Sequence, residues 1–143
     1  MKKVGLLLAA IMLTAALFAG CGIKEADIPY ADGMAENILQ GIKANDYAMF
    51  SRDFSGKLKA AINEDAFLGM VAQFADTIGT YESKAFAQAA NKTEDDVEYT
   101  VVVYKAKFTE EDSDVLVTVT FGGEDDSRTV EGLFFTSPIL RGE

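Results

Sequence analysis

Few side chains in this sequence carry reactive groups, because it contains one cysteine and no histidine. Without histidine, Ser-His-Asp and Cys-His nucleophilic arrangements are excluded, and most zinc sites and the usual general base near neutral pH are lost as well. No glycine-rich phosphate-binding loop occurs, since the Gly122-Gly123 pair is typical of a turn. The groups that remain are Cys21, the carboxylates and the tyrosines, and we predict no catalytic residue, metal ligand or cofactor.

Cys21 lies at the end of a segment typical of a lipoprotein signal. Two lysines near the N-terminus precede an apolar run at 4–18, and the small residues Ala19 and Gly20 come directly before the cysteine. The run is shorter than the roughly 20 residues of a spanning helix and matches the apolar region of a signal peptide. We predict that residues 1–20 are removed and that lipidated Cys21 anchors the protein to the cell membrane on its extracytoplasmic side. An ordinary secretory signal and an uncleaved anchor helix are the alternatives.

The charge of the mature chain restricts its partners. Cleavage before Cys21 leaves 11 basic and 23 acidic residues, a net charge of −12. Such a surface repels phosphate backbones, so nucleic-acid binding is excluded as a function class. We predict a short tether at residues 21–30 and one folded domain at residues 31–143, which is long enough to bury a core without disulfides.

Three helices are predicted in the first half of this domain. The first runs from Ala31, the second follows a cap at Asn45-Asp46, and the third runs from about Asn63 to a left-handed cap at Gly79. Their apolar residues recur at three- and four-residue spacing, which places them on one face of each helix. The positions are, in chain order, Ala35, Ile38, Leu39, Ile42, Tyr47, Phe50, Phe54, Phe67, Met70, Val71, Phe74 and Ile78.

After Gly79 the apolar period changes to two, and β-branched and aromatic residues become frequent. Short polar connections favour hairpins, so we predict a four-stranded antiparallel meander with the helices packed on one face, an α+β fold. The predicted strands are 81–89, 97–108, 115–121 and 129–136, and the predicted connections are 91–96, 109–114 and 122–127.

Both faces of this sheet carry apolar residues. In the second strand, Val101 and Val103 share one face, and Val102 and Tyr104 share the other. One layer of helices covers only one face, so the outer face is either a homodimer interface or part of a long strand twisted around the edge of the core. The sequence leaves both interpretations open.

Acidic residues gather in the predicted turns. In a meander the first and third turns lie at the same end, so the carboxylates of 94–96 should approach those of 124–126, while 110–114 crowds the opposite end. Calcium takes about six to eight oxygen ligands, which such turns can supply. No segment has the spacing of an EF-hand loop, and solvated turns explain the same residues.

Several segments carry a resemblance to known families. The helical stretch 41–55, Ile78-Gly79-Thr80-Tyr81, the strand segment 104–108 and Gly132-Leu133-Phe134-Phe135 are similar to segments of an uncharacterised lipoprotein domain family. Three helices followed by a bent meander resemble the nuclear transport factor 2-like, or SnoaL-like, cone fold, which is also cystatin-like. The resemblance covers nearly all of the mature chain and implies a fold, but no segment is a catalytic motif.

The cone fold implies two kinds of site. An aspartate base beside a tyrosine donor, as in the ketosteroid isomerase branch, would use Asp46, Tyr47 and Asp53, provided that an aspartate is buried in an apolar cavity. Asp46 is also explained as a helix cap, and Asp53 as a solvated residue. The alternative is an apolar cavity, or else a filled core, lined by Phe50, Phe54, Phe74, Tyr81, Tyr104, Phe108 and Phe121.

We therefore predict a membrane-anchored binding or interaction module without catalytic activity. A binder of a small apolar ligand in the cone cavity is the second hypothesis, and an isomerase- or dehydratase-like enzyme is the third. The state of the cavity separates them: a filled interior favours protein partners, an open apolar one favours a ligand, and a buried carboxylate within it favours an enzyme.

Overall fold

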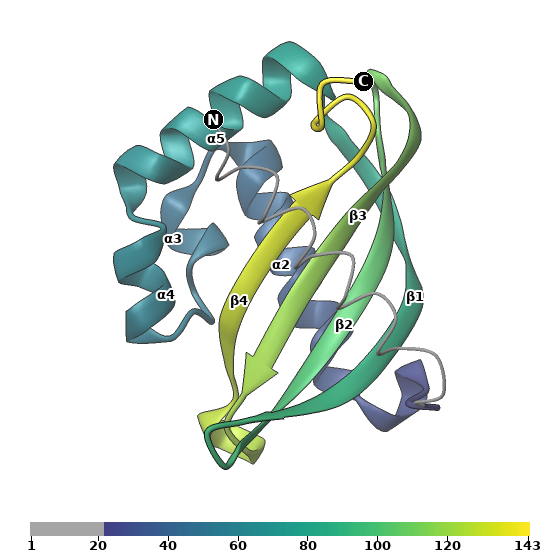
Figure 1. Cartoon of the computed structure of the whole chain (residues 1–143). Helices are drawn as coiled ribbons and strands as arrows, with labels where there is room; N and C mark the ends of the chain where they lie inside the picture. The colour runs from purple at the N-terminus through teal and green to yellow at the C-terminus, as the bar shows by residue number, and fades with distance from the viewer. Residues whose placement is uncertain (1–21) are drawn as a thin grey trace, which may run out of the picture.

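The computed structural model describes residues 22–143, in which helices precede a four-stranded sheet (Figure 1). The helical elements are η1 (Glu25–Asp27), α2 (Pro29–Ala44), α3 (Tyr47–Phe50), α4 (Gly56–Ala61) and α5 (Glu64–Thr77). The strands are β1 (Tyr81–Glu94), β2 (Val97–Phe108), β3 (Glu111–Gly122) and β4 (Thr129–Thr136), with η2 (Asp125–Ser127) between the last two. In this part of the chain, no helix has both the length and the apolar character needed to span a membrane.

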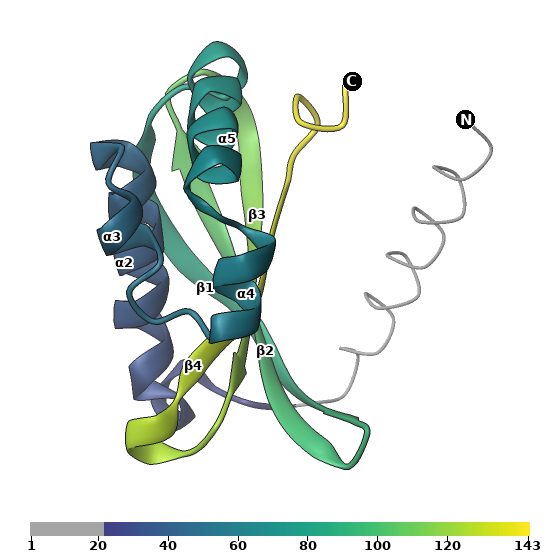
Figure 2. The ribbon, with the colours of Figure 1, turned by 90° about the vertical axis from the view of Figure 1, so that its left-hand side faces the viewer.

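The predicted α+β meander is confirmed. The strands lie in the order β1-β2-β3-β4, and each neighbouring pair is antiparallel. Helices α2, α3 and α5 lie on one face of the sheet (Figure 2). Alternation along β3 turns Val115, Val117 and Val119 toward these helices, and each of the three is fully buried. The core therefore lies between one helical layer and one face of a twisted sheet.

Helices α2 and α5 follow the predicted periodicity. On α2, Ala35, Ile38 and Leu39 are at most 1% exposed, which places the predicted face in the core. Helix α5 buries Phe67 and Phe74. Its end is also as predicted: Gly79 adopts a φ of +84°, and its amide donates a 2.7 Å hydrogen bond to the carbonyl of Phe74.

The second predicted helix is wrong beyond Phe50. The chain leaves helix α3 because the Asp53–Ser55 segment pairs with β4 instead. The Val130 amide donates to the Asp53 carbonyl at 2.7 Å, and the Ser55 amide donates to the Val130 carbonyl at 2.9 Å. Helix α4 then starts at a Ser55 cap and was not predicted, since Leu58 is its one buried apolar residue.

Two of the predicted turns are too long. Strand β1 continues to Glu94 because Asp95 and Asp96, at φ 52° and 63°, form a two-residue turn, and aspartate tolerates that conformation. Strand β3 begins at Glu111, four residues before the predicted start.

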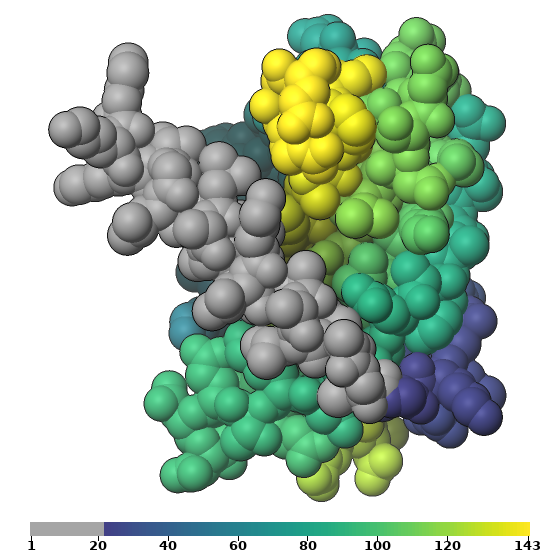
Figure 3. Space-filling model, turned by 45° about the vertical axis from the view of Figure 1, so that its right-hand side comes forward, coloured from purple at the N-terminus to yellow at the C-terminus, as the bar shows by residue number. Residues whose placement is uncertain are grey.

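Glu111 is a buried part of the fold rather than a solvated turn residue. Its carboxylate accepts hydrogen bonds from the amides of Ile139 at 3.0 Å and Ser113 at 3.1 Å. The bond from Ile139, with that from Ser137, lowers the pKa of this carboxyl. The C-terminal residues thereby rest against the sheet, as the yellow atoms in Figure 3 show.

The predicted tether at residues 21–30 is also too long. Pro29 is the first residue of α2, a position that suits its fixed φ, and Ile28 is 6% exposed. The ring of Tyr30 packs edge-on against Phe121 at 5.2 Å between centroids. Of the described residues, 22–24 precede the first helical element, η1. The predicted signal peptide and Cys21 lie outside the described residues.

Candidate functional site

The seven aromatic residues expected to line a cavity lie in the core. Each is at most 5% exposed. Their rings contact one another or neighbouring rings. The ring centroid of Phe50 lies 4.8 Å from that of Phe54 and 4.6 Å from that of Phe67, and the ring centroids of Tyr81 and Phe108 lie 5.7 Å apart. Aromatic side chains packed in this way fill the space between helices and sheet. Phe74 also lines a cleft at the surface.

A polar cluster links α2 to the sheet on the inner face. The Tyr81 hydroxyl donates a 2.6 Å hydrogen bond to the Glu36 carboxylate. Lys84, whose side chain is 6% exposed, forms an ion pair with Asp32, and its ammonium group lies 5.0 Å from the centroid of the Tyr104 ring. These contacts fasten the edge strand β1 to α2.

The two tyrosines of this cluster remain protonated near neutral pH. Burial raises the pKa of Tyr81, as do its hydrogen bond to Glu36 and the charge of that carboxylate. Burial, and next the charge of Asp32, raises the pKa of Tyr104. The Tyr104 hydroxyl has no hydrogen-bond partner among the described residues. Both hydroxyls can therefore donate hydrogen bonds, but neither is a base.

The predicted isomerase set is not assembled into a site. Asp46 is exposed and accepts a 3.0 Å hydrogen bond from the Met49 amide, which makes it the cap of α3. The Asp53 carboxylate forms an ion pair with the guanidinium group of Arg52 at 3.1 Å. The Tyr47 hydroxyl donates to the carbonyl of Ile62 at 2.8 Å. These side chains have structural partners, and the two aspartates do not line an apolar cavity.

The acidic turns do not form a metal site either. The β1–β2 turn and η2 lie at the same end of the sheet, as predicted, but they diverge in Figure 2. Among residues 22–143, no group of three or more aspartate, glutamate, cysteine or histidine side chains is placed to hold a metal ion. The carboxylates of 94–96 and 124–126 are therefore not placed to share a cation in the described part of the chain.

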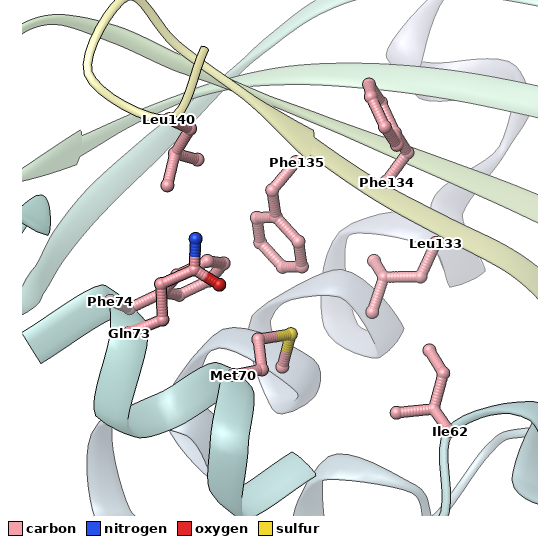
Figure 4. A pocket seen from close by; sticks show the side chains of 8 residues that line it. All are labelled: Ile62, Met70, Gln73, Phe74, Leu133, Phe134, Phe135 and Leu140. Atoms are coloured by element: carbon pink, nitrogen blue, oxygen red, sulfur yellow. The ribbon is translucent and has the colours of Figure 1, made fainter. Parts of the chain in front are cut away.

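A cleft of about 280 Å³, lined mainly by residues with apolar side chains, lies between α5 and β4. Figure 4 shows Met70 and Phe74 of α5 facing Leu133 and Phe135 of β4, whereas Phe134 points to the other side of the strand. The ring of Phe135 packs edge-on against Phe74 at 5.1 Å, which forms the floor of the cleft. The complete lining is Ile62, Met70, Gln73, Phe74, Leu133, Phe134, Phe135 and Leu140.

A second, larger cleft of about 420 Å³ lies between α4, the β1–β2 hairpin and β4. Its walls carry charges of both signs, including the Lys92–Glu94 ion pair at 2.9 Å. Ligand sites are mostly apolar with a few polar groups, and the α5–β4 cleft, with Gln73 as its one polar lining residue, fits that description better. We therefore take the α5–β4 cleft as the candidate site.

Sequence reasoning found only one residue of this cleft, Phe74. A signal for the rest was present, because Met70 and Phe74 are spaced four apart on a helix, and Leu133, Phe134 and Phe135 are consecutive apolar residues in a strand. Such a run must place apolar groups on both faces of the sheet. Phe134, on the outer face, is 45% exposed, and Val97 at the start of β2 is 47% exposed.

A helical layer on one face of an antiparallel meander defines an α+β domain, and the comparisons with known proteins assign it to a family. The chain belongs to the family described as Protein of unknown function (DUF3887), whose model matches residues 35–133, from within α2 to β4. The prediction of an uncharacterised domain family is thereby confirmed. No curated protein and no solved structure matches the chain.

Proposed function

We propose that this protein is a lipid-anchored, extracytoplasmic binding module without catalytic activity, and that its binding site is the α5–β4 cleft. The observation that carries the proposal is the cleft itself, an opening beside an otherwise filled core with seven apolar residues among its eight lining residues. The ligand is therefore proposed to bind in the α5–β4 cleft and not in the interior of the cone. The order of helices and strands is consistent with a nuclear transport factor 2-like arrangement, which supports the same reading of the fold.

The chemistry of the lining supports binding rather than catalysis. No carboxylate, lysine or tyrosine lines the α5–β4 cleft. The most perturbed tyrosines, Tyr81 and Tyr104, have pKa values raised away from neutral pH and line neither cleft. General acid–base catalysis needs a titratable group within reach of the substrate. The cleft instead offers apolar contacts and the Gln73 amide.

Loss of Met70, which faces the cleft, is expected to weaken binding of an apolar probe there. Burying a methionine side chain is worth about 1.5–3 kcal/mol, so Met70→Ser should reduce the affinity for N-phenylnaphthylamine about tenfold. The measurement is a fluorescence titration of purified residues 22–143. Val97→Ser is the control, because Val97 is an exposed apolar residue that lines the other cleft, and it should bind the dye as the unmodified domain does. Equal affinities for the two variants, or no binding by the unmodified domain, would refute the site.

The lipid anchor is tested at Cys21. Cells that express the full chain and are fed an alkyne-tagged fatty acid should incorporate the tag, and Cys21→Ala should abolish its incorporation because the thioether requires the cysteine sulfur. Two acyl chains hold a protein stably at a membrane, whereas one chain binds reversibly. An equal amount of tag in both proteins would show that the anchor is not at Cys21.

A further inference from the structure

Strand β4 is an edge strand whose free edge is only partly paired. At its beginning, Val130 exchanges two backbone hydrogen bonds with the Asp53–Ser55 segment, which runs parallel to it. Further along, residues 131–136 make no backbone–backbone hydrogen bond outside the sheet within the described part of the chain. An unpaired edge leaves amide and carbonyl groups available to another strand.

The cleft lies along this free edge. Leu133, Phe134 and Phe135 are consecutive, so their side chains alternate between the two faces of the sheet, yet all three line the same cleft. Leu133 and Phe135 face α5, and Phe134 exposes its ring on the opposite face. A chain placed along the edge of β4 would therefore have apolar side chains of β4 beside it on both faces of the sheet.

The two elements that flank the cleft carry charges of one sign, although none of these charged residues lines it. Helix α5 carries Glu64, Asp65 and Asp76, β4 carries Glu131, and neither element contains a lysine or arginine. Arg141, which follows the lining residue Leu140, is paired with Glu143. On α4, which also borders β4, Lys57 lines the other cleft. Carboxylates around an uncharged cleft favour an occupant with apolar residues between basic ones.

We propose that the occupant is an extended, apolar segment of a partner polypeptide flanked by basic residues, which adds to β4 as a fifth strand of the sheet. The segment continues the edge pairing that Asp53–Ser55 begins at Val130. Main-chain hydrogen bonds to residues 131–136 supply affinity, and the apolar lining selects alternate side chains of the segment. This inference rests on the proposed function, because it names the partner of the same cleft.

The test uses the full chain in phosphatidylcholine vesicles and a synthetic peptide in which valine and threonine alternate between terminal lysines. Fluorescence anisotropy should show binding, and hydrogen exchange should show that the peptide protects backbone amides within residues 131–136. The same peptide with N-methyl groups on every amide of the valine–threonine run keeps its side chains but has no backbone N–H donor on either edge. Its affinity should be at least about tenfold lower, which corresponds to about 1.4 kcal/mol.

A pair of variants locates the site without depending on the modified peptide. Phe134→Lys places a charge on the outer face beside the unpaired edge and should weaken peptide binding about tenfold, whereas Val97→Lys, an equally exposed position in an inner strand, should not. Thermal melting of each variant establishes that it is folded.

The remaining outcomes would overturn the proposal in distinguishable ways. Binding without amide protection, or equal affinity of the two peptides, would refute strand addition and leave the cleft as a site for side chains alone. If the protein binds the dye but not the peptide, strand addition is likewise refuted. If it binds neither the dye nor the peptide, the proposed function is refuted as well. Protection of these amides without peptide, increasing with protein concentration, would assign the edge to a second copy of this chain.

Discussion

Replacement of Phe50 by alanine is expected to lower the free energy of unfolding by about 3–5 kcal/mol, a large part of the stability of a domain of this size. Phe50 is fully buried, and its ring centroid lies 4.6 Å from that of Phe67, 4.8 Å from that of Phe54 and 6.3 Å from that of Tyr47. Truncation removes these contacts at once and leaves a cavity bounded by α3, α5 and the segment that follows α3, which cannot all collapse into it.

Urea denaturation of the domain measures this effect as a shift of the midpoint at constant slope. Leu68→Ala is the matched control, since Leu68 is an apolar residue of α5 that is 45% exposed, and its loss should change the stability by no more than about 0.5 kcal/mol. Similar effects of the two substitutions would mean that Phe50 is not part of a tightly packed core.

Replacement of Gly41 by alanine is expected to destabilise the domain by about 1–3 kcal/mol, although alanine is the better helix former. A Cβ atom at this position of α2 would lie 2.5 Å from the backbone nitrogen of Phe50 and 2.6 Å from its Cα atom. Those atoms belong to the main chain of α3, so no side-chain rotation relieves the overlap. The two helices would have to separate.

Gly33 provides the opposite result in the same helix. A Cβ atom there has no atom within 4 Å apart from the neighbouring backbone of α2, so Gly33→Ala should stabilise the domain by about 0.5–1 kcal/mol through the helix preference alone. The two alanine variants can be compared by thermal melting. A stabilising effect of both would contradict the close approach of α2 and α3.

Together these residues show how the helical layer is built. Asn45, at φ 55°, ends α2, and the amide of Asp46 donates to the carbonyl of Gly41 at 2.9 Å, which reverses the chain. The reversal brings Phe50 onto Gly41 and directs its ring into the core. The same reversal leaves Asp46 at the surface as a cap, which explains why this aspartate does not enter an apolar cavity.

Local patterns were enough to predict much of the fold. The faces of α2 and α5, the C-cap at Gly79 and the bounds of β2 and β4 follow from apolar spacing and cap chemistry. Prediction from local patterns failed where a segment distant in the sequence pairs with the same residues. Phe54 continues a helical pattern, but its neighbours form hydrogen bonds with Val130, some 75 residues later in the chain, and a local pattern contains no record of that pairing.

The candidate site shows the same division. The sequence by itself determined that the chain lacks histidine, that both faces of the sheet carry apolar residues, and that the strands form a meander, because residue type and period decide these properties. Only the tertiary structure decided that Phe50 and Tyr104 fill the core whereas Phe74 and Phe135 border an opening. Periodicity specifies which face a side chain occupies, but the distance between α5 and the edge of β4 is set by the packing of the whole helical layer on the sheet.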